Sequence, residues 1–536
     1  MRKSAKKAAF EMDSTSTLRA IFDKRDDGNQ TAVIIPRSCP IPTTLSYNQL
    51  YGVIQEFCTK LASIVPSSQL APGNSISIAY PNSLEFVVSF LACGLMRLVA
   101  SPLNPAYTKE EFLFYLEDAN STVMIVPPGS IKRNYAAVLA AQQRRGIHVI
   151  EVFWNGKSIV MNTAQTEVSS NGQPVVFSPQ PEDVALLLHT SGTTGRPKGV
   201  PLSHLNLTTS MKNVSNTYKL TPNDRTLLVM PLFHIHGLIS GLLATLLSGG
   251  SAVIPQRFSA SSFWSDFIEM KCNWYTAVPT MHQILLQNPP STVPYIRFIR
   301  SCSSSLAPTT FHALKRTFKA PVLEAYAMTE ASHQMTSNPL PEFGESKPGT
   351  VGLGQGVEVA ILDDKGNPVE EGEVCVRGRN ITRGYLNNPQ ANAEAFTADG
   401  FFRTGDQGKK DKDGYLILTG RIKELINRGG EKISPLELDA VLLTHPSVSE
   451  AVTFGVPSEM YGQEVHAAVV LKSPTKSVTA VEKELQNYVQ SKVAKFKVPK
   501  RIHVTEQLPK GGTGKIQRRL MADIFAKSEP NLKSKL

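Results

Sequence analysis

A short apolar run, Val184–Leu188, leads directly into a loop, His189–Gly199, that is rich in glycine, serine and threonine and carries Lys198. The apolar run predicts a buried strand. Glycine lets the backbone approach a ligand closely, the amides and hydroxyls can surround a phosphate oxygen, and a lysine adds positive charge. The spacing does not match the Walker P-loop. From the residues alone, the segment fits either a phosphate-binding loop that follows a strand or an ordinary polar loop.

Strand-like runs alternate with helical stretches over the first 330 residues, which predicts an α/β fold with parallel sheets. The expected strands are 75–79, 122–126 and 321–324, and the expected helices are 83–96 and 109–118. From about residue 350, short strands with Gly and Asn/Asp turns predict a small β-rich, barrel-like subdomain. A compact α+β unit is expected after Arg421, with helices near 436–443 and 480–493.

The bulk properties describe an ordinary soluble protein of more than one domain. The chain has 536 residues, of which 41% are hydrophobic and 19% charged, so a single core is not expected. Six scattered cysteines without a Cys-x-x-Cys pair argue against a disulfide framework or a zinc site. The most apolar stretch, 237–247, is too short to span a bilayer and predicts a core helix. No signal peptide is expected at the basic N-terminus.

Positive charge is concentrated near the C-terminus. Residues 491–536 hold twelve Lys/Arg against three acids, a net +9 within a chain of net +11. Such a block fits a polyanionic substrate, a solvated face or nucleic acid. The segment has no interleaved aromatic residues and no recognisable nucleic-acid module. RNA binding through this segment therefore stays the remote alternative.

Four further motifs follow the loop in a fixed order: Tyr326–Glu330, Arg403–Asp406, Gly420–Pro435 and Leu508–Arg518. Together with the loop they resemble the adenylate-forming superfamily of acyl- and aryl-CoA synthetases, luciferases and peptide-synthetase adenylation domains, over nearly the whole chain. The resemblance implies ATP, Mg²⁺ and CoA as cofactor and substrates. It also implies an N-terminal domain (1–422) of two doubly wound α/β subdomains plus the β-rich one, and a mobile lid (423–533) hinged at Lys423.

The resemblance implies a role for each motif residue. Tyr326 would stack on adenine beside Glu324 and Ala325, Thr329 would bind the α-phosphate, and Glu330 would ligate Mg²⁺. The residues assigned to ATP or AMP are Thr190, Ser191, Gly192, Thr193, Thr194, Gly195, Lys198, Ser304, Glu324, Ala325, Tyr326, Thr329, Asp406 and Arg421. Asp406 would accept both ribose hydroxyls. From residue type alone, Glu330 also fits a helix N-terminal acid and Tyr326 a core tyrosine.

The same resemblance places the second half of the chemistry on the lid. Lys515 would bridge the acyl carboxylate and ribose oxygens during adenylation, although a lysine in a Gly-rich basic loop also fits plain surface charge. The lid would then rotate at Lys423 and present Arg428-Gly429-Gly430 to the pantetheine arm. Glycines suit this role because the thiol arm must slide along bare backbone.

The acyl pocket is expected to contain imidazoles and hydroxyls. His234 fits a position common across the superfamily and is assigned to catalysis, while His236, Ser303 and His333 are assigned to the acyl group. These side chains suit a second carboxylate, because a buried unpaired anion is prohibitive. The alternative is that the histidines are satisfied core groups.

Within the superfamily, the chain is most similar to peroxisomal CoA synthetases of fungi and to plant oxalyl-CoA synthetases. Three segments carry this similarity: Arg300–Ser305, Glu324–His333 and Gly420–Pro435. The implied reaction converts oxalate, ATP and CoA to oxalyl-CoA, AMP and pyrophosphate. A short- or medium-chain or aryl carboxylate–CoA ligase is the alternative. The final Ser534-Lys535-Leu536 matches the signal read by the peroxisomal import receptor, so a peroxisomal matrix protein without membrane insertion is expected.

Overall fold

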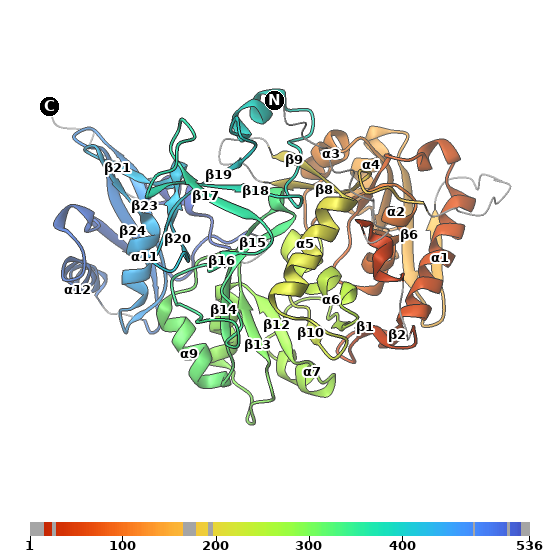
Figure 1. The fold of residues 1–536 in the computed structure, drawn as a ribbon, viewed down its shortest axis with the longest axis horizontal. Helices are drawn as coiled ribbons and strands as arrows, with labels where there is room; N and C mark the ends of the chain where they lie inside the picture. The colour runs from red at the N-terminus through yellow and green to blue at the C-terminus, as the bar shows by residue number, and fades with distance from the viewer. Residues whose placement is uncertain are drawn as a thin grey trace, which may run out of the picture.

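The computed structural model describes residues 16–23, 28–163, 178–190, 197–474, 477–511 and 515–526. Four sheets organise these ranges (Figure 1). Figure 1 shows the seven-stranded sheet at one end of the molecule, the C-terminal unit in blue at the other, and the nine-stranded sheet in green between them. None of the helices within these ranges is long and apolar enough to cross a membrane.

The seven-stranded sheet has the order β7-β6-β5-β3-β4-β8-β9. Its interior strands run parallel, and β7 and β9 close the two edges in antiparallel fashion. Its strands are β3 (Ser75–Ile78), β4 (Val99–Pro102), β5 (Ser121–Val126), β6 (His148–Trp154), β7 (Ile159–Thr163), β8 (Val184–Thr190) and β9 (Lys198–Ser203). Between the parallel strands come α2 (Leu84–Leu95), α3 (Lys109–Asp118) and α4 (Ala136–Arg144). This is the predicted strand–helix alternation.

The nine-stranded sheet has the order β16-β15-β14-β13-β12-β10-β11-β1-β2. The first two strands of the chain join it, because β1 pairs in parallel with β11. Its strands are β1 (Thr31–Ile35), β2 (Thr43–Ser46), β10 (Arg225–Leu227), β11 (Ser251–Val253), β12 (Trp274–Ala277), β13 (Phe298–Ser301), β14 (Val322–Met328), β15 (His333–Ser337) and β16 (Leu353–Gly354). The carboxyl ends of β13 and β14 carry the predicted acyl and nucleotide motifs.

One buried core joins the two large sheets. It contains Ile76 and Ile125 of the seven-stranded sheet, Trp274 of the nine-stranded sheet, and residues of α1 (Tyr47–Ile64), α2 and α5 (His204–Thr217). Local sequence fixes where these helices begin. Ser46 and Gln49 form a reciprocal capping box at α1, which satisfies two amides that the first turn leaves unpaired.

The predicted core helix over 237–247 is buried, but most of it is a π-helix. The segment His236–Leu243 (η4) is π-helical and continues into α6 (Ala244–Leu247). A π-helix of this length is rare, and such segments are frequently found at functional sites. The strands and helices expected at the other named positions are confirmed, with bounds shifted by at most four residues.

The last third of the chain forms two smaller sheets. The β-rich subdomain is a four-stranded antiparallel sheet of β17 (Glu358–Leu362), β18 (Glu371–Arg377), β19 (Phe402–Lys410) and β20 (Leu416–Arg421). The C-terminal sheet contains β21 (Ile426–Arg428), β22 (Glu431–Ile433), β23 (Val448–Ser458), β24 (Gly462–Leu471) and β25 (Arg501–Val504). It packs with α11 (Pro435–Leu443) and α12 (Val478–Gln490) around a core of its own.

The predicted hinge residue lies where these two sheets meet. Lys423 is exposed in a 3₁₀ turn, η6 (Ile422–Glu424), that directly follows β20 and precedes β21. The turn has few buried contacts, so it is a suitable place for rotation. The domain boundary at Lys423 stays a prediction.

Candidate active site

The ribose motif is organised by strand register. Asp406 on β19 and Arg421 at the end of β20 are directly opposite each other in the antiparallel ladder. Arg421 Nε lies 3.2 Å from one oxygen of Asp406, and the Tyr326 hydroxyl donates a hydrogen bond to the other. Burial, followed by the neighbouring Asp406 carboxylate, raises the pKa of Tyr326, so the phenol stays protonated. The Asp406 carboxylate is therefore held in a fixed orientation, as recognition of vicinal hydroxyls requires.

The candidate magnesium ligand is a buried carboxylate. Glu330 lies in η5 (Thr329–Ala331), is 7% exposed, and accepts a 3.0 Å hydrogen bond from the Tyr385 hydroxyl. Burial raises the pKa of Glu330, while Tyr385, Arg421 and Lys198 oppose that rise. The described residues contain no group of three or more metal-binding side chains. A single carboxylate fits Mg²⁺ that takes its other ligands from phosphate and water.

Tyr385 connects this carboxylate to the phosphate loop. Lys198 Nζ lies 4.6 Å from the centre of the Tyr385 ring. Thr190 and Lys198 are paired across β8 and β9, at the two ends of the loop. Five of the predicted phosphate ligands lie outside the described residues: Ser191, Gly192, Thr193, Thr194 and Gly195. Sequence reasoning missed Tyr385, because no motif marks it and only the fold brings it to Glu330.

The other nucleotide residues take varied positions. Glu324 is buried, accepts a 3.0 Å hydrogen bond from the Gly349 amide, and has its pKa raised to about 8 by burial. This contact anchors the chain near Gly349, a role that the motif did not suggest. Ala325 is buried on β14, Thr329 is half-buried in η5, and Ser304 is exposed.

The predicted acyl residues surround a buried arginine. Arg300 on β13 is fully buried, and within the described ranges no carboxylate forms an ion pair with it. Its Nη2 donates to His333 Nε2 at 3.0 Å, and its Nη1 lies 3.2 Å from His236 Nε2. The remaining partners are neutral oxygens, those of Tyr218, Thr276 and Gln334. The sequence analysis names Arg300 in a motif but assigns it no role, because the sequence around an arginine does not show whether its side chain is buried.

Arg300 sets the protonation pattern of both imidazoles. A guanidinium only donates hydrogen bonds, so each ring nitrogen that faces it must accept, and the proton must sit on Nδ1. His236 Nδ1 then donates to Ser303 Oγ at 3.0 Å, which leaves the Ser303 hydroxyl proton for another acceptor. His333 Nδ1 is buried and has no hydrogen-bond partner among the residues that the structure describes. Burial and then Arg300 hold the pKa of both histidines well below 6.5, so both rings are neutral at pH 7.

Strained backbone holds two of these donors in place. Ser303 has φ +72° and His333 has φ +101°, both in the region that favours glycine. Non-glycine residues keep such angles only where the surrounding structure enforces them, commonly at functional sites. The two imidazoles stack with centroids 5.1 Å apart and an angle of 20°. Three predicted residues, from η4, the connection that follows β13, and β15, thus meet at one point. Since both nitrogens of His236 are engaged, its role is to position Ser303 and Arg300.

Lys515 and His234 connect the lid to this centre. Burial, followed by the Lys515 charge, lowers the pKa of His234 to about 4. The His236 amide donates to His234 Nδ1 at 3.2 Å, so the neutral ring carries its proton on Nε2. Lys515 is exposed as a residue, and its ammonium interacts electrostatically with the ribose cluster. Burial and then Arg421 lower the pKa of that ammonium, whereas Asp406 raises it. Lys515 therefore faces the ribose cluster and His234.

The predicted pantetheine loop is held within the C-terminal unit. Arg428 forms an ion pair with Glu464, and its guanidinium lies 4.1 Å from the centre of the Tyr461 ring. Gly429 and Gly430 have φ +61° and +93°, and the Gly429 amide donates to the Tyr461 carbonyl. Lys515, rather than this loop, is the lid element directed at the nucleotide residues.

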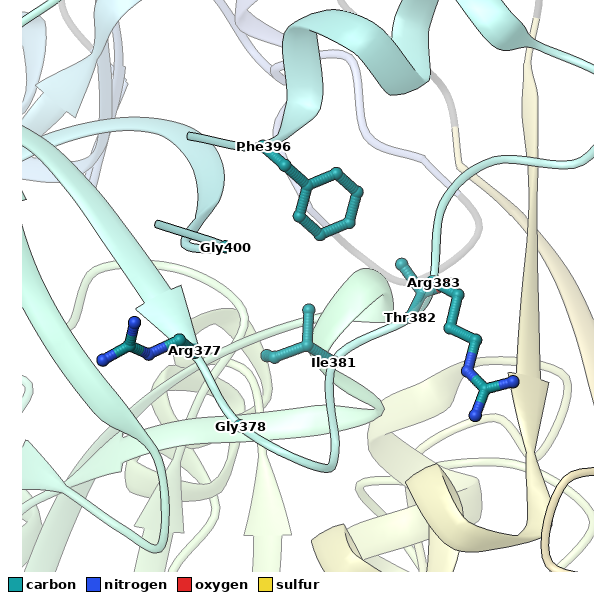
Figure 2. A pocket seen from close by; sticks show the side chains of 7 residues that line it. All are labelled: Arg377, Gly378, Ile381, Thr382, Arg383, Phe396 and Gly400. Carbon is teal, nitrogen blue, oxygen red and sulfur yellow. The ribbon is translucent and has the colours of Figure 1, made fainter. Parts of the chain in front are cut away.

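A cavity of about 320 Å³ lies elsewhere, beside the connection that follows β18 (Figure 2). Its lining residues are Arg377, Gly378, Ile381, Thr382, Arg383, Phe396 and Gly400. Figure 2 shows the two guanidinium groups pointing away from each other. Arg377 pairs with Glu358 and Arg383 with Glu182, so neither charge is free for an anion. This cavity contains none of the predicted site residues.

The chain is similar to known proteins over most of its length. Residues 24–386 match the AMP-binding enzyme family, and residues 437–515 match the AMP-binding enzyme C-terminal domain. The chain is 48% identical to an oxalate–CoA ligase of Saccharomyces cerevisiae, over 98% of this chain and 100% of that protein. It is 49% identical to an oxalate–CoA ligase of Arabidopsis thaliana, over 90% and 93% of the two chains.

A solved structure shares the fold as well. The ATP-bound MatB from Rhodopseudomonas palustris superposes with a TM-score of 0.84 at 28% identity and covers 95% of this chain and 99% of its own. The predicted α/β architecture, with a large N-terminal and a smaller C-terminal domain, is thereby confirmed. Since the family matches span most of the sequence, the chain belongs to the AMP-binding enzyme family.

Proposed function

We propose that this protein is an ATP-dependent, AMP-forming oxalate–CoA ligase. Its relatives of that name are about half identical over nearly the full chain. The reaction has two steps. One oxalate carboxylate oxygen attacks the α-phosphorus of ATP and pyrophosphate leaves. The CoA sulfur then attacks the oxalyl carbonyl, AMP leaves, and the thiol proton is released.

The observation that carries the substrate assignment is the buried charge of Arg300. A buried cation without an anionic partner is costly, and the cost is removed when a bound anion supplies the opposite charge. Arg300 is ringed by neutral groups, and the adjacent Nδ1–H of His333 is an unused buried donor. A dicarboxylate leaves one carboxylate for these donors while the other reacts. A fatty acid would leave both the charge and the donor unmet.

The reacting carboxylate has its own supporting groups. Adenylation brings an anion to an anionic phosphate, so positive charge must be supplied. Lys515 lies beside Asp406 and His234 and supplies one such charge. Glu330 would hold Mg²⁺, which would neutralise the triphosphate as a Lewis acid. The neutral His234 carries an Nε2–H that can donate to the substrate carboxylate.

The test measures pyrophosphate release from ATP with oxalate, malonate, acetate, octanoate and coumarate. We expect oxalate to give the highest kcat/KM, with octanoate and coumarate at least tenfold lower. A matched reaction with the Lys515→Ala variant controls for release by a contaminating enzyme. A preference for octanoate or coumarate would overturn the oxalate assignment while leaving the adenylation chemistry intact.

We further propose that a chain ending in Ser534-Lys535-Leu536 is imported into the peroxisomal matrix by the receptor for that signal. These residues lie outside the described ranges, so the proposal rests on the sequence. Deleting them should leave a tagged protein in the cytosol with unchanged ligase activity in vitro. Import of the truncated protein in cells that lack the full-length copy would contradict the proposal.

A further inference from the structure

The base of the loop that carries Lys515 is formed by residues 509–511 and 515–517 of the C-terminal unit, which pair with each other. The Gly511 amide donates to the Lys515 carbonyl, and the Gln517 amide donates to the Pro509 carbonyl, both at 2.8 Å. Ile516 packs against a small apolar cluster that contains Leu508 and Met521. Lys510 adds an ion pair with Glu450 on β23, at 2.7 Å. These contacts hold the base of the loop to the C-terminal unit, and none of them reaches the turn that contains the hinge.

Arg518, three residues after Lys515, makes the polar contacts that fix the base. Its Nη2 lies 2.9 Å from Asp439 Oδ2 on α11, and its Nη1 donates to the Thr453 carbonyl on β23 at 2.6 Å. Its Nε lies 3.2 Å from Glu424 Oε2. Asp439 is itself positioned, since its other oxygen accepts a hydrogen bond from the Thr453 amide. One guanidinium thus joins a helix, a strand and the turn that contains Glu424.

The Glu424 contact gives this anchor a link to the hinge. Glu424 directly follows Lys423, the predicted pivot, in the turn η6. Its carboxylate also acts electrostatically on Lys515, raising the pKa of the ammonium that burial lowers. The turn at the hinge and the loop that carries the lysine are therefore tied to the same guanidinium. Any rotation at Lys423 that changes the orientation of Glu424 also changes what holds the loop.

We propose that Arg518 is a positioning residue for adenylation: through Glu424 and Asp439 it holds the Lys515 loop in the orientation that serves the first half-reaction. The proposal rests on the proposed function, since it assigns Lys515 to adenylation. Arg518 does not touch the substrate. Its effect is expected only in the step that uses Lys515, and only while Lys515 is present.

The neighbouring arginine provides a matched control. Arg519 is exposed, and within the described part of the chain it forms no ion pair. It carries the same charge one position away, so Arg519→Gln removes the same net charge from the same segment. A difference between Arg518→Gln and Arg519→Gln then reports the contacts of Arg518 rather than the overall charge of the lid.

The experiment uses the full chain with the acid of the panel above that the wild-type enzyme adenylates fastest. Adenylation is followed as acid-dependent pyrophosphate–ATP exchange, and thioesterification as CoA thioester formed from the synthetic acyl-AMP. We expect Arg518→Gln to slow adenylation by about 10- to 100-fold and thioesterification by less than threefold. Arg519→Gln should change neither, and Arg518→Lys should recover part of the adenylation rate. Equal losses in both half-reactions would overturn the proposal.

A double-mutant cycle separates positioning from general damage. If Arg518 acts through Lys515, Arg518→Gln should add no further loss in the Lys515→Ala background. Losses that multiply would show an independent, structural role and overturn the proposal. Glu424→Gln, which keeps the shape of the side chain, provides a second variant if Arg518→Gln does not fold. It should give a smaller loss that is also confined to adenylation. Because the acid is chosen by activity, a wrong oxalate assignment would not be mistaken for a failure of Arg518.

Discussion

At the scale of single residues, the acyl site depends on a cation that controls the tautomers of its neighbours. Arg300 can only donate, so His236 and His333 must accept through Nε2 and present Nδ1–H on their far sides. A lysine at the same position would supply the charge without a planar fork that reaches both rings. One buried guanidinium thus supplies the positive charge for an anion and sets which imidazole nitrogens donate hydrogen bonds.

Replacing His333 with alanine should change substrate preference as well as rate. The change removes an Nδ1–H donor that is assigned to the distal carboxylate, and a hydrogen bond to a charged group is worth roughly 1.5–3 kcal/mol. The kcat/KM for oxalate should fall about tenfold or more, whereas butyrate, which has no distal carboxylate, should not be penalised. Steady-state kinetics with both acids measures the ratio.

The matched control is His312→Ala, because His312 is an exposed histidine on α9 (Pro308–Phe318). It should leave both rates unchanged, and Ser303→Ala should resemble His333→Ala. If His333→Ala lowers kcat/KM for oxalate and for butyrate by the same factor, the residue has a structural role. The groups around Arg300 then do not recognise the second carboxylate.

At the scale of elements, the π-helix η4 sets the position of His236. Its wider backbone is packed tightly against the preceding turn. A Cβ added at Gly237 would lie 2.4 Å from the Pro231 carbonyl oxygen and 2.7 Å from that of Met230. Both obstacles are backbone atoms, so the helix itself would have to move. The glycine directly follows His236, whose ring holds Ser303.

Gly237→Ala should therefore reduce ligase activity by more than tenfold and lower the thermal unfolding midpoint. Overpacking of this kind costs about 1–3 kcal/mol. Gly52→Ala in α1 is the matched control, because nothing lies within 4 Å of an added Cβ there. That change should be neutral or slightly stabilising, since alanine favours helix. Full activity in the Gly237→Ala variant would mean that ligase activity does not depend on the present position of the π-helix.

At the scale of the whole molecule, we propose that the orientation of the lid determines which half-reaction the site serves. Lys515 acts electrostatically on Asp406, Arg421 and His234, whereas Arg428 is paired with Glu464 away from them. The described arrangement is therefore the one expected for adenylation. The second half-reaction would require rotation at Lys423 to exchange Lys515 for the Arg428–Gly430 loop.

Lys515→Ala should block adenylation but leave thioesterification of supplied acyl-AMP within about threefold of wild type. The charge of Lys515 interacts electrostatically with the ribose cluster in the described arrangement, so we expect the loss of charge stabilisation to fall on the first step. Single-turnover measurements of each half-reaction provide the check. Glycine-loop variants such as Gly430→Ala should show the opposite pattern. Equal loss of both steps in Lys515→Ala would contradict an arrangement-specific role.

The sequence by itself determined the nucleotide half of the site and the layer architecture. Tyr326, Glu330, Asp406 and Arg421 lie in contiguous motifs, and their resemblance to the adenylate-forming superfamily is enough to assign them to the nucleotide. Strand–helix periodicity is local, so the sequence also predicts the layers. The same resemblance assigned Thr190 and Lys198, which the structure pairs across β8 and β9 on either side of the loop.

Only the tertiary structure decided the acyl half. Arg300, Tyr385 and Arg518 acquire their roles from partners far along the chain, namely His236, Glu330 and Glu424, which lie 55 to 94 residues away. The apolar sequence of η4 is like that of any core helix, so its π-helical form depends on tertiary packing. The burial, tautomer and charge partners of a side chain depend on its contacts with residues of other elements. The spacing of residues along the chain does not specify those contacts, because they form only when the chain folds.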